Sequence, residues 1–127
     1  MTYSNNKDLV VKMYQAYSES NREMIELLIA ETFEFFSPLD NGINRETYFE
    51  RCWPNHKRIS NFHFLHFFEK ENIVFVTYEG QTIKNEKFRN CEIITFENKK
   101  IIKVEVYFGW NLPHKAQKGQ FIEPESL

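Results

Sequence analysis

The stretch that decides the fold is residues 88–110, FRNCEIITFENKKIIKVEVYFGW. Two runs rich in β-branched and aromatic residues, 88–96 and 101–110, flank the polar turn at 97–100, which is the pattern of an antiparallel hairpin. Upstream, the run IVFVTYE at 73–79 predicts another strand, and the Phe-rich segment 61–69 predicts one more. The second half of the chain is therefore expected to form a meander of long antiparallel strands.

The first half of the chain carries helical signals. Apolar residues recur with a period of 3.6 between residues 9 and 17, and Asn5 is placed to cap that helix. Ser20 and Glu23 have the spacing of a capping box, which predicts that a second, shorter helix begins after Ser20.

A third helix is expected after a short strand and a turn. Residues 33–37 predict the strand and residues 39–42 the turn. Asn44 can then cap the helix, which Pro54 is expected to end.

This order of elements predicts an α+β fold, because helices come first and an antiparallel meander follows. Three short helices can cover a sheet of about four to six strands only in part. A strongly curved sheet that is half covered leaves a cavity. A cavity lined by aromatic and a few polar groups is by default a ligand-binding site.

Composition narrows the class of protein. The 127 residues predict one domain, and the net charge of −2 excludes a tail built for nucleic acid. Aromatic residues make up 17% of the chain, including 13 Phe, which indicates a packed interior or an apolar cavity. No apolar run approaches the roughly 18 residues that a membrane span needs. The polar start of the chain lacks the apolar core of a signal peptide, so a cytoplasmic location is expected.

Neither a metal nor another cofactor is expected. His63 and His66 are three residues apart in a predicted strand, and odd spacing places them on opposite faces. Cys52 and Cys91 lack metal-ligand spacing and are expected to be small buried apolar residues. No glycine-rich phosphate loop or nucleophile elbow is present in the sequence.

Several segments together resemble one superfamily. They are VVKMY at 10–14, FFSP at 35–38, RNCEI at 89–93, KIIKVEVYFG at 100–109 and the stretch from 37 to 54. Their order resembles the nuclear transport factor 2-like superfamily, most of all its ketosteroid-isomerase-like and SnoaL-like (polyketide cyclase) branches. The resemblance spans about residues 5–112. It implies a cone-shaped α+β barrel, three N-terminal helices packed on a curved, mostly antiparallel sheet, which is usually dimeric.

The resemblance also implies a polar pair in the pocket. Tyr14 falls where ketosteroid isomerases keep the Tyr that donates to an enolate oxygen, and Glu92 falls at about the position of its acidic partner. The alternative for Tyr14 is a core residue whose hydroxyl finds one partner. Ser37 departs from the family, because its position matches the catalytic Asp and a hydroxyl is far too weak a base. Asp40 is either a displaced base at the pocket mouth or a turn residue that bonds its own backbone.

Further pocket residues follow from the same resemblance. The inner face of the last strand is expected to present Val106 and Phe108, and the neighbouring strand Val74, Val76 and Tyr78, with Trp53 and Trp110 closing the ends. Epoxide-hydrolase members carry a catalytic Asp where this chain has Val106, so that chemistry is disfavoured.

Two functions remain open at this point. One is a protein that binds a small apolar molecule, with proton transfer of the isomerase or cyclase type as the leading reaction if it is an enzyme. The other is a non-catalytic dimeric module whose cavity is filled by its own Phe side chains. Fold alone does not decide between them, because the superfamily hosts enzymes, carriers and scaffolds. An open cavity of a few hundred Å³ would favour the first.

Overall fold

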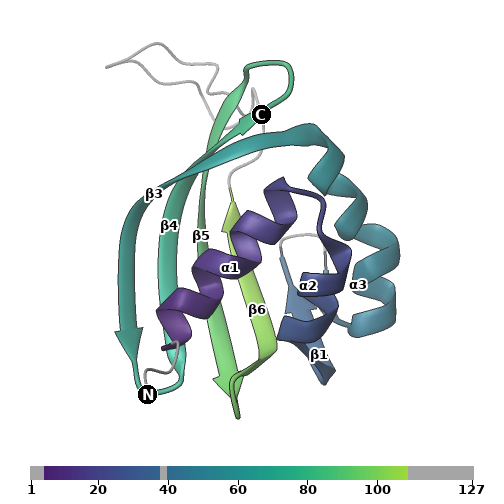
Figure 1. Ribbon diagram of the computed structural model, residues 1–127, viewed down its shortest axis with the longest axis vertical. Helices are drawn as coiled ribbons and strands as arrows, with labels where there is room; N and C mark the ends of the chain where they lie inside the picture. The colour runs from purple at the N-terminus through teal and green to yellow at the C-terminus, as the bar shows by residue number, and fades with distance from the viewer. Residues whose placement is uncertain (1–4, 38–39, 109–127) are drawn as a thin grey trace, which may run out of the picture.

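The structure is a computed structural model that describes residues 5–37 and 40–108. Its described part holds three α-helices, one 3-10 helix and six strands (Figure 1). In chain order these are α1 (Asn6–Ser18), α2 (Arg22–Leu28), β1 (Ile29–Phe36), β2 (Asn41–Asn44), α3 (Arg45–Arg51), η1 (Trp53–Arg58), β3 (Ile59–Lys70), β4 (Ile73–Thr82), β5 (Lys87–Glu97) and β6 (Lys100–Phe108). The predicted α+β class is confirmed.

The six strands form one curved sheet in the order β2-β1-β6-β5-β4-β3. All neighbours are antiparallel except β1 and β6, which run parallel. The sheet wraps around α1, while α2 and α3 lie near β1 (Figure 1). The predicted turn at 39–42 is partly wrong, because Asn41 and Gly42 already belong to the short strand β2, which pairs with β1.

Two of the three predicted helix caps are confirmed. The side chain of Asn5 accepts from the backbone N–H of Asp8 at 2.8 Å, and that of Asn44 accepts from Thr47 at 2.9 Å. The prediction for α2 is wrong by one residue, because Asn21 is the cap. Ser20 has a φ of 59° in the turn that closes α1, so it does not open the next helix.

Pro54 does not end the helical segment as predicted. Helix α3 ends at Arg51, and the chain continues as the 3-10 helix η1 with Pro54 in its first turn. Proline is tolerated there, because the backbone N–H of a first turn has no partner within the helix. The continuation ends at Arg58, directly before β3, and Arg58 and Ile59 both line the cavity described below.

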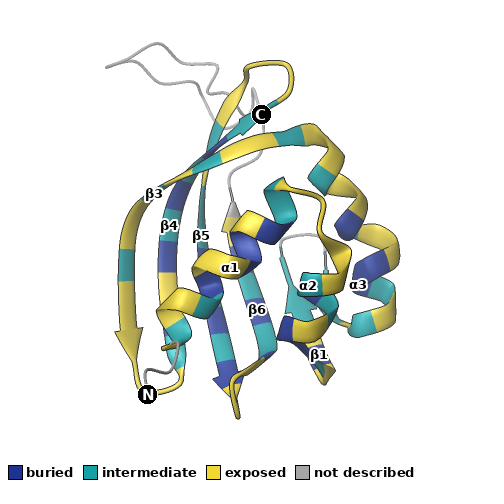
Figure 2. Ribbon diagram, in the orientation of Figure 1, coloured by how far each residue is buried: buried dark blue, intermediate teal, exposed yellow. Residues whose placement is uncertain are grey.

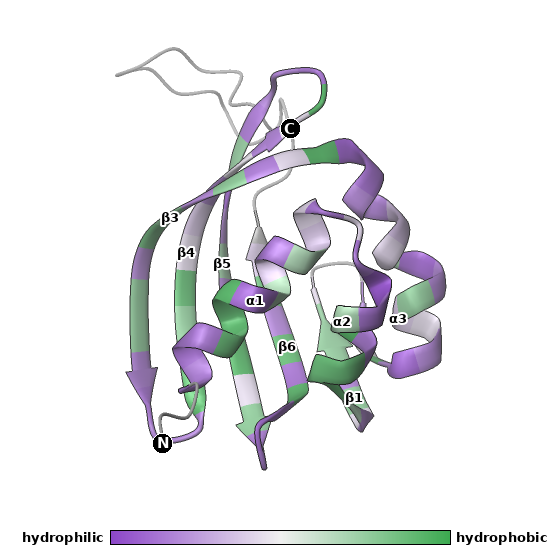
Figure 3. Cartoon of the chain, in the orientation of Figure 1, coloured by the Kyte–Doolittle hydropathy of each residue, from purple (hydrophilic) through white to green (hydrophobic). Residues whose placement is uncertain are grey.

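The core lies between α1 and the concave face of the sheet. Along β4 and β5 buried and more exposed residues alternate, as Figure 2 shows. Hydropathy in Figure 3 does not follow this alternation, because the first four residues of β4 are all apolar. Val74, Val76 and Ile94 are completely buried, whereas Phe75 on the convex face is 41% exposed. In the described part of the chain, no helix is both long and apolar enough to cross a membrane.

Candidate functional site

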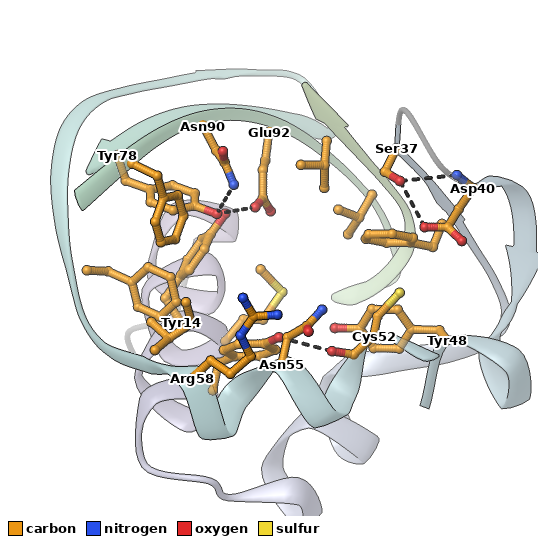
Figure 4. Close-up of a pocket in the computed structure, with 18 of the residues that line it drawn as sticks. Tyr14, Ser37, Asp40, Tyr48, Cys52, Asn55, Arg58, Tyr78, Asn90 and Glu92 are labelled. Atoms are coloured by element: carbon orange, nitrogen blue, oxygen red, sulfur yellow. Dashed lines mark hydrogen bonds between the residues drawn. The ribbon is translucent and has the colours of Figure 1, made fainter. Parts of the chain in front are cut away.

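A cavity of about 420 Å³ lies between the helices and the concave face of the sheet (Figure 4). Much of its wall is apolar, including Met13, Ile29, Phe33, Phe62 and Val104. Two hydrogen-bonded groups of polar side chains line it, one on β4 and β5 and one around the end of β1, and η1 adds Asn55 and Arg58. The cavity therefore has the shape and the mixed lining of a small-molecule site.

The first polar group is a hydrogen-bonded chain on adjacent strands. The Tyr78 hydroxyl donates to Glu92 Oε2 at 2.6 Å, and Asn90 Nδ2 donates to the Tyr78 hydroxyl at 2.9 Å. The register explains this, because Tyr78 faces Asn90 and Val76 faces Glu92 across the β4–β5 ladder. Residues 90 and 92 are two apart, so both side chains reach the same face.

Burial controls the charge of Glu92. The residue is 8% exposed and is the buried polar residue of the described core. Loss of water raises the pKa of its carboxyl above the ordinary value, while the hydroxyls of Tyr14 and Tyr78 lower it, and burial is the larger effect. Glu92 therefore keeps a proton to higher pH than a solvated glutamate does and can donate a hydrogen bond.

The hydroxyl of Tyr14 lies near Glu92 and has no hydrogen-bond partner among the described residues. The residue is 4% exposed, and its ring packs edge-on against Phe62, Phe64 and Tyr78. Its hydroxyl lies close enough to Glu92 to affect the pKa of that carboxyl, but it meets no hydrogen-bond geometry with any described group. Burial, and then the Glu92 carboxyl, raise the pKa of Tyr14, so the hydroxyl stays protonated and is a donor.

Asn90 contributes a second polar atom that lacks a hydrogen-bond partner. Its Oδ1 is buried without a hydrogen-bond partner in the described part of the chain. An unpaired buried polar group costs about 1–3 kcal/mol. Tyr14 and Asn90 thus each present one unpaired polar atom beside the cavity.

The second polar group is built around Asp40. Ser37 Oγ donates to Asp40 Oδ2 at 2.8 Å, and the backbone N–H of Asp40 donates back to Ser37 Oγ at 3.2 Å. Arg51 Nε donates to Asp40 Oδ1 at 3.1 Å. Both carboxylate oxygens of Asp40 are thus engaged, one by Ser37 and the other by Arg51.

The structure brings some of the expected residues together. Tyr14, Ser37, Asp40, Tyr78, Glu92 and Val106 all line the cavity. Others lie elsewhere, which corrects the expectation: Val74 and Val76 are core residues away from the cavity, and Trp53 packs on Tyr17 and His56. The alternating pattern identified the inner face, but it did not show which part of that face the helices cover.

Two expected residues are not placed. Phe108 is the last residue of β6, and its side chain is outside the description; Trp110 lies outside the described residues.

Many cavity residues were not expected from the sequence, and three polar ones matter most for the site. They are Asn90, Tyr48 and Arg58. A signal existed for Asn90, because it precedes Glu92 by two positions on one strand and therefore shares its face. No local signal marked Tyr48 or Arg58, because their place depends on how α3 and η1 pack against the sheet.

Cysteine chemistry at this site depends on the protonation of Cys52. Cys52 lines the cavity, but burial raises the pKa of its thiol to about 12, which leaves it protonated at neutral pH. Within residues 5–37 and 40–108, no group of three His, Cys, Asp or Glu side chains is arranged to hold a metal ion.

His63 and His66 lie on the same face of β3, not on opposite faces as predicted. A bulge between Phe64 and His66 shifts the register, so that His63 pairs with Glu79 and His66 with Thr77. Glu79 and Thr77 are two positions apart on β4, so their side chains lie on the same face, and so do those of the two histidines.

Comparison with known proteins gives fold relatives only. No family model matches the chain, and no curated protein matches it in sequence. An NTF2-like protein of unknown function from Cytophaga hutchinsonii is 20% identical, with a TM-score of 0.70 over 85% of this chain and 93% of that one.

Two Streptomyces proteins have similar structures. AclR from Streptomyces galilaeus, a proposed hydroxylase, is 12% identical, with a TM-score of 0.72 over 84% of this chain and 76% of that one. IdmH from Streptomyces antibioticus, a proposed polyketide cyclase, is 12% identical, with a TM-score of 0.68 over 81% and 91%. The helices, the curved mixed sheet and these relatives agree, and the chain has the nuclear transport factor 2-like fold.

Proposed function

We propose that this protein is a SnoaL-like member of the superfamily and binds a small, largely apolar molecule whose carbonyl or hydroxyl group meets Tyr14 and Glu92. One observation carries the proposal: a buried, protonated and unpaired Tyr14 hydroxyl stands at the wall of a 420 Å³ cavity. A carbonyl oxygen at that point would accept from Tyr14 and, at a pH where Glu92 keeps its proton, from the Glu92 carboxyl.

The size of the cavity favours binding over a filled structural module. Protein interiors pack to about 0.75 of their volume and leave few voids larger than a water molecule. A void of 420 Å³ in a chain with 13 Phe residues is not what a self-filled core would leave. The same surroundings make the interior of the cavity favourable for apolar ligand atoms.

The same geometry supports proton transfer at a carbon next to a carbonyl group. A base removes the proton from that carbon, the electron pair of the C–H bond moves toward the carbonyl, and the oxygen gains negative charge. The Tyr14 hydroxyl, and Glu92 where it keeps its proton, would stabilise that oxygen by hydrogen bonds. Asp40 is a carboxylate at the cavity that could act as the base, but its bonds to Ser37 and Arg51 compete with that role. Binding is therefore the primary function that we propose, and catalysis the secondary one.

A naphthalene ketone tests the proposal. The fluorophore 6-propionyl-2-(dimethylamino)naphthalene has an apolar body and a carbonyl group, and its emission shifts to the blue in an apolar site. We expect saturable binding to the wild-type protein and about two- to tenfold weaker binding to Tyr14→Phe, the value of one hydrogen bond. Tyr107→Phe is the matched control, because Tyr107 is 56% exposed. Absence of binding to the wild-type protein, or equal affinity in all three proteins, would contradict the proposal.

A further inference from the structure

Arg58 stands at the cavity without an anionic partner. It is the last residue of η1, and Figure 4 shows its guanidinium pointing into the cavity, on the opposite side from Glu92. Among the described residues it forms no ion pair.

The other cations near the cavity are already engaged. Arg51 pairs with Asp40 at 3.1 Å, and Lys87 lies 4.0 Å from Glu79. Glu86 also lines the cavity, but it forms no ion pair with Arg58 in the described structure. The charge that Arg58 offers is therefore available to a ligand.

The Arg58 side and the Glu92 side of the cavity favour different chemical groups of a ligand. Arg58 is an exposed residue that lines the cavity, so its guanidinium is accessible to an entering ligand. A guanidinium presents its N–H groups as a fork that matches the two oxygens of a carboxylate. On the Glu92 side an anionic group would meet the unpaired Oδ1 of Asn90, which is itself an acceptor. Arg58 therefore determines the orientation of an anionic ligand in the cavity.

We propose that the ligand is an apolar organic acid, with its carboxylate on Arg58 and its carbonyl or hydroxyl group on Tyr14 and Glu92. This inference rests on the proposed binding function and adds the charge and the orientation of the ligand. It implies that a neutral molecule of the same shape binds less tightly than the acid.

Two fluorophores that differ in one group provide the test. 1-Anilinonaphthalene-8-sulfonate carries a single anionic group, and N-phenyl-1-naphthylamine is the same molecule without it. We expect Arg58→Gln to weaken binding of the sulfonate about tenfold, as expected for loss of a charged hydrogen bond, and to leave binding of the neutral amine unchanged. Arg58→Lys keeps the charge but lacks the forked N–H groups. We expect its affinity for the sulfonate to lie between those of the wild type and Arg58→Gln.

Two controls locate the probes. Arg22→Gln makes the same change of charge on α2, away from the cavity lining, and should alter neither affinity. Phe75→Ser removes an exposed ring from the convex face and should also alter neither. If Phe75→Ser bound neither probe, the probes would bind at the convex face and not in the cavity, which would contradict the inference.

The outcomes separate the inference from the function on which it rests. If both probes bind the wild-type protein and Arg58→Gln weakens neither, the anionic ligand is wrong and the binding function stands. If neither probe and no naphthalene ketone binds the wild-type protein, the binding function fails and the inference fails with it.

Discussion

The Tyr78 hydroxyl donates a 2.6 Å hydrogen bond to the carboxyl of Glu92, two positions along the ladder on the neighbouring strand. Tyr78 is 3% exposed, so both partners of this bond are shielded from water. The bond serves two purposes. It satisfies one oxygen of a buried carboxyl, and it holds Glu92 in position beside the cavity, near the unpaired hydroxyl of Tyr14.

Removal of the Tyr78 hydroxyl should therefore destabilise the fold. Tyr78→Phe leaves Glu92 Oε2 and Asn90 Nδ2 without this partner, and we expect the free energy of unfolding to fall by about 1–3 kcal/mol. Urea denaturation measures the change. Tyr107→Phe removes an exposed hydroxyl and should stay within about 0.5 kcal/mol of the wild type. Equal stability of the two variants would show that the bond contributes nothing.

The raised pKa of Glu92 predicts how stability depends on pH. Because its pKa is higher in the folded protein than the ordinary 4.5, the folded state binds the proton more tightly. The stabilising effect of that proton is complete below pH 4.5 and is lost as pH rises through the folded pKa. Between these two pKa values the contribution of Glu92 to the free energy of unfolding decreases as pH rises. The decrease is at most about 1.4 kcal/mol per pH unit, the value for one proton.

Glu92→Gln isolates this effect, because its amide does not titrate. We expect the difference in unfolding free energy, wild type minus variant, to decrease as pH rises above 4.5. Urea denaturation of both proteins from pH 4.5 to 8 measures it. A constant difference, or one that increases with pH, would mean that Glu92 is charged in the folded protein.

Much of the fold could be predicted from the sequence because the signals were local. The caps at Asn5 and Asn44 depend on residues three positions away, and the strand runs from 73 to 108 depend on composition and period. Strand β2 could not be predicted in this way. Its residues Asn41 and Gly42 favour turns, and only pairing with β1 makes them a strand.

The candidate site was harder to predict than the fold. Alternation places a residue on the inner face, but Val76 and Tyr78 share that face and only Tyr78 reaches the cavity. The difference depends on where α1 covers the sheet, which is a tertiary property. Arg58 enters the site because the chain continues as η1 past Pro54, where the sequence pattern predicted an end.

The convex face of the sheet predicts a dimer. Phe75 and Phe68 pair across β3 and β4, and they are 41% and 67% exposed; Tyr107 on β6 is 56% exposed. Exposed aromatic residues on one sheet face are typical of an interface between copies. We expect sedimentation to show a two-fold dimer at micromolar concentration and Phe75→Lys to shift it toward monomer.

A matched control tests whether the convex face is responsible. Leu27 is 64% exposed on α2, so Leu27→Lys adds the same charge at an exposed apolar residue of a helix. We expect this variant to remain dimeric. A monomeric wild-type protein, or dimers in both variants, would rule out the convex face as the interface.

The last prediction concerns the missing base. Ketosteroid isomerisation needs a base where this chain has Ser37, and general acid–base catalysis contributes about 100- to 10,000-fold. We therefore expect negligible turnover of a 5-ene-3-ketosteroid by the wild-type protein, measured by the ultraviolet absorbance of the conjugated product. Turnover that Asp40→Asn abolishes would instead identify Asp40 as a displaced base.

Introducing a base at position 37 needs two changes, because of what Ser37 contacts. Its hydroxyl donates to Asp40 at 2.8 Å, so Ser37→Asp would place two carboxyl groups in contact, and they would compete for one proton. That single variant should have a lower free energy of unfolding than the wild type and only a trace of added activity. Ser37→Asp with Asp40→Asn restores a donor beside the new carboxylate, which then stays ionised. We expect the double variant to be the most active of the series, since Tyr14 and Glu92 are already in place to stabilise the enolate oxygen, and a double variant no more active than Ser37→Asp alone would show that they do not hold this substrate.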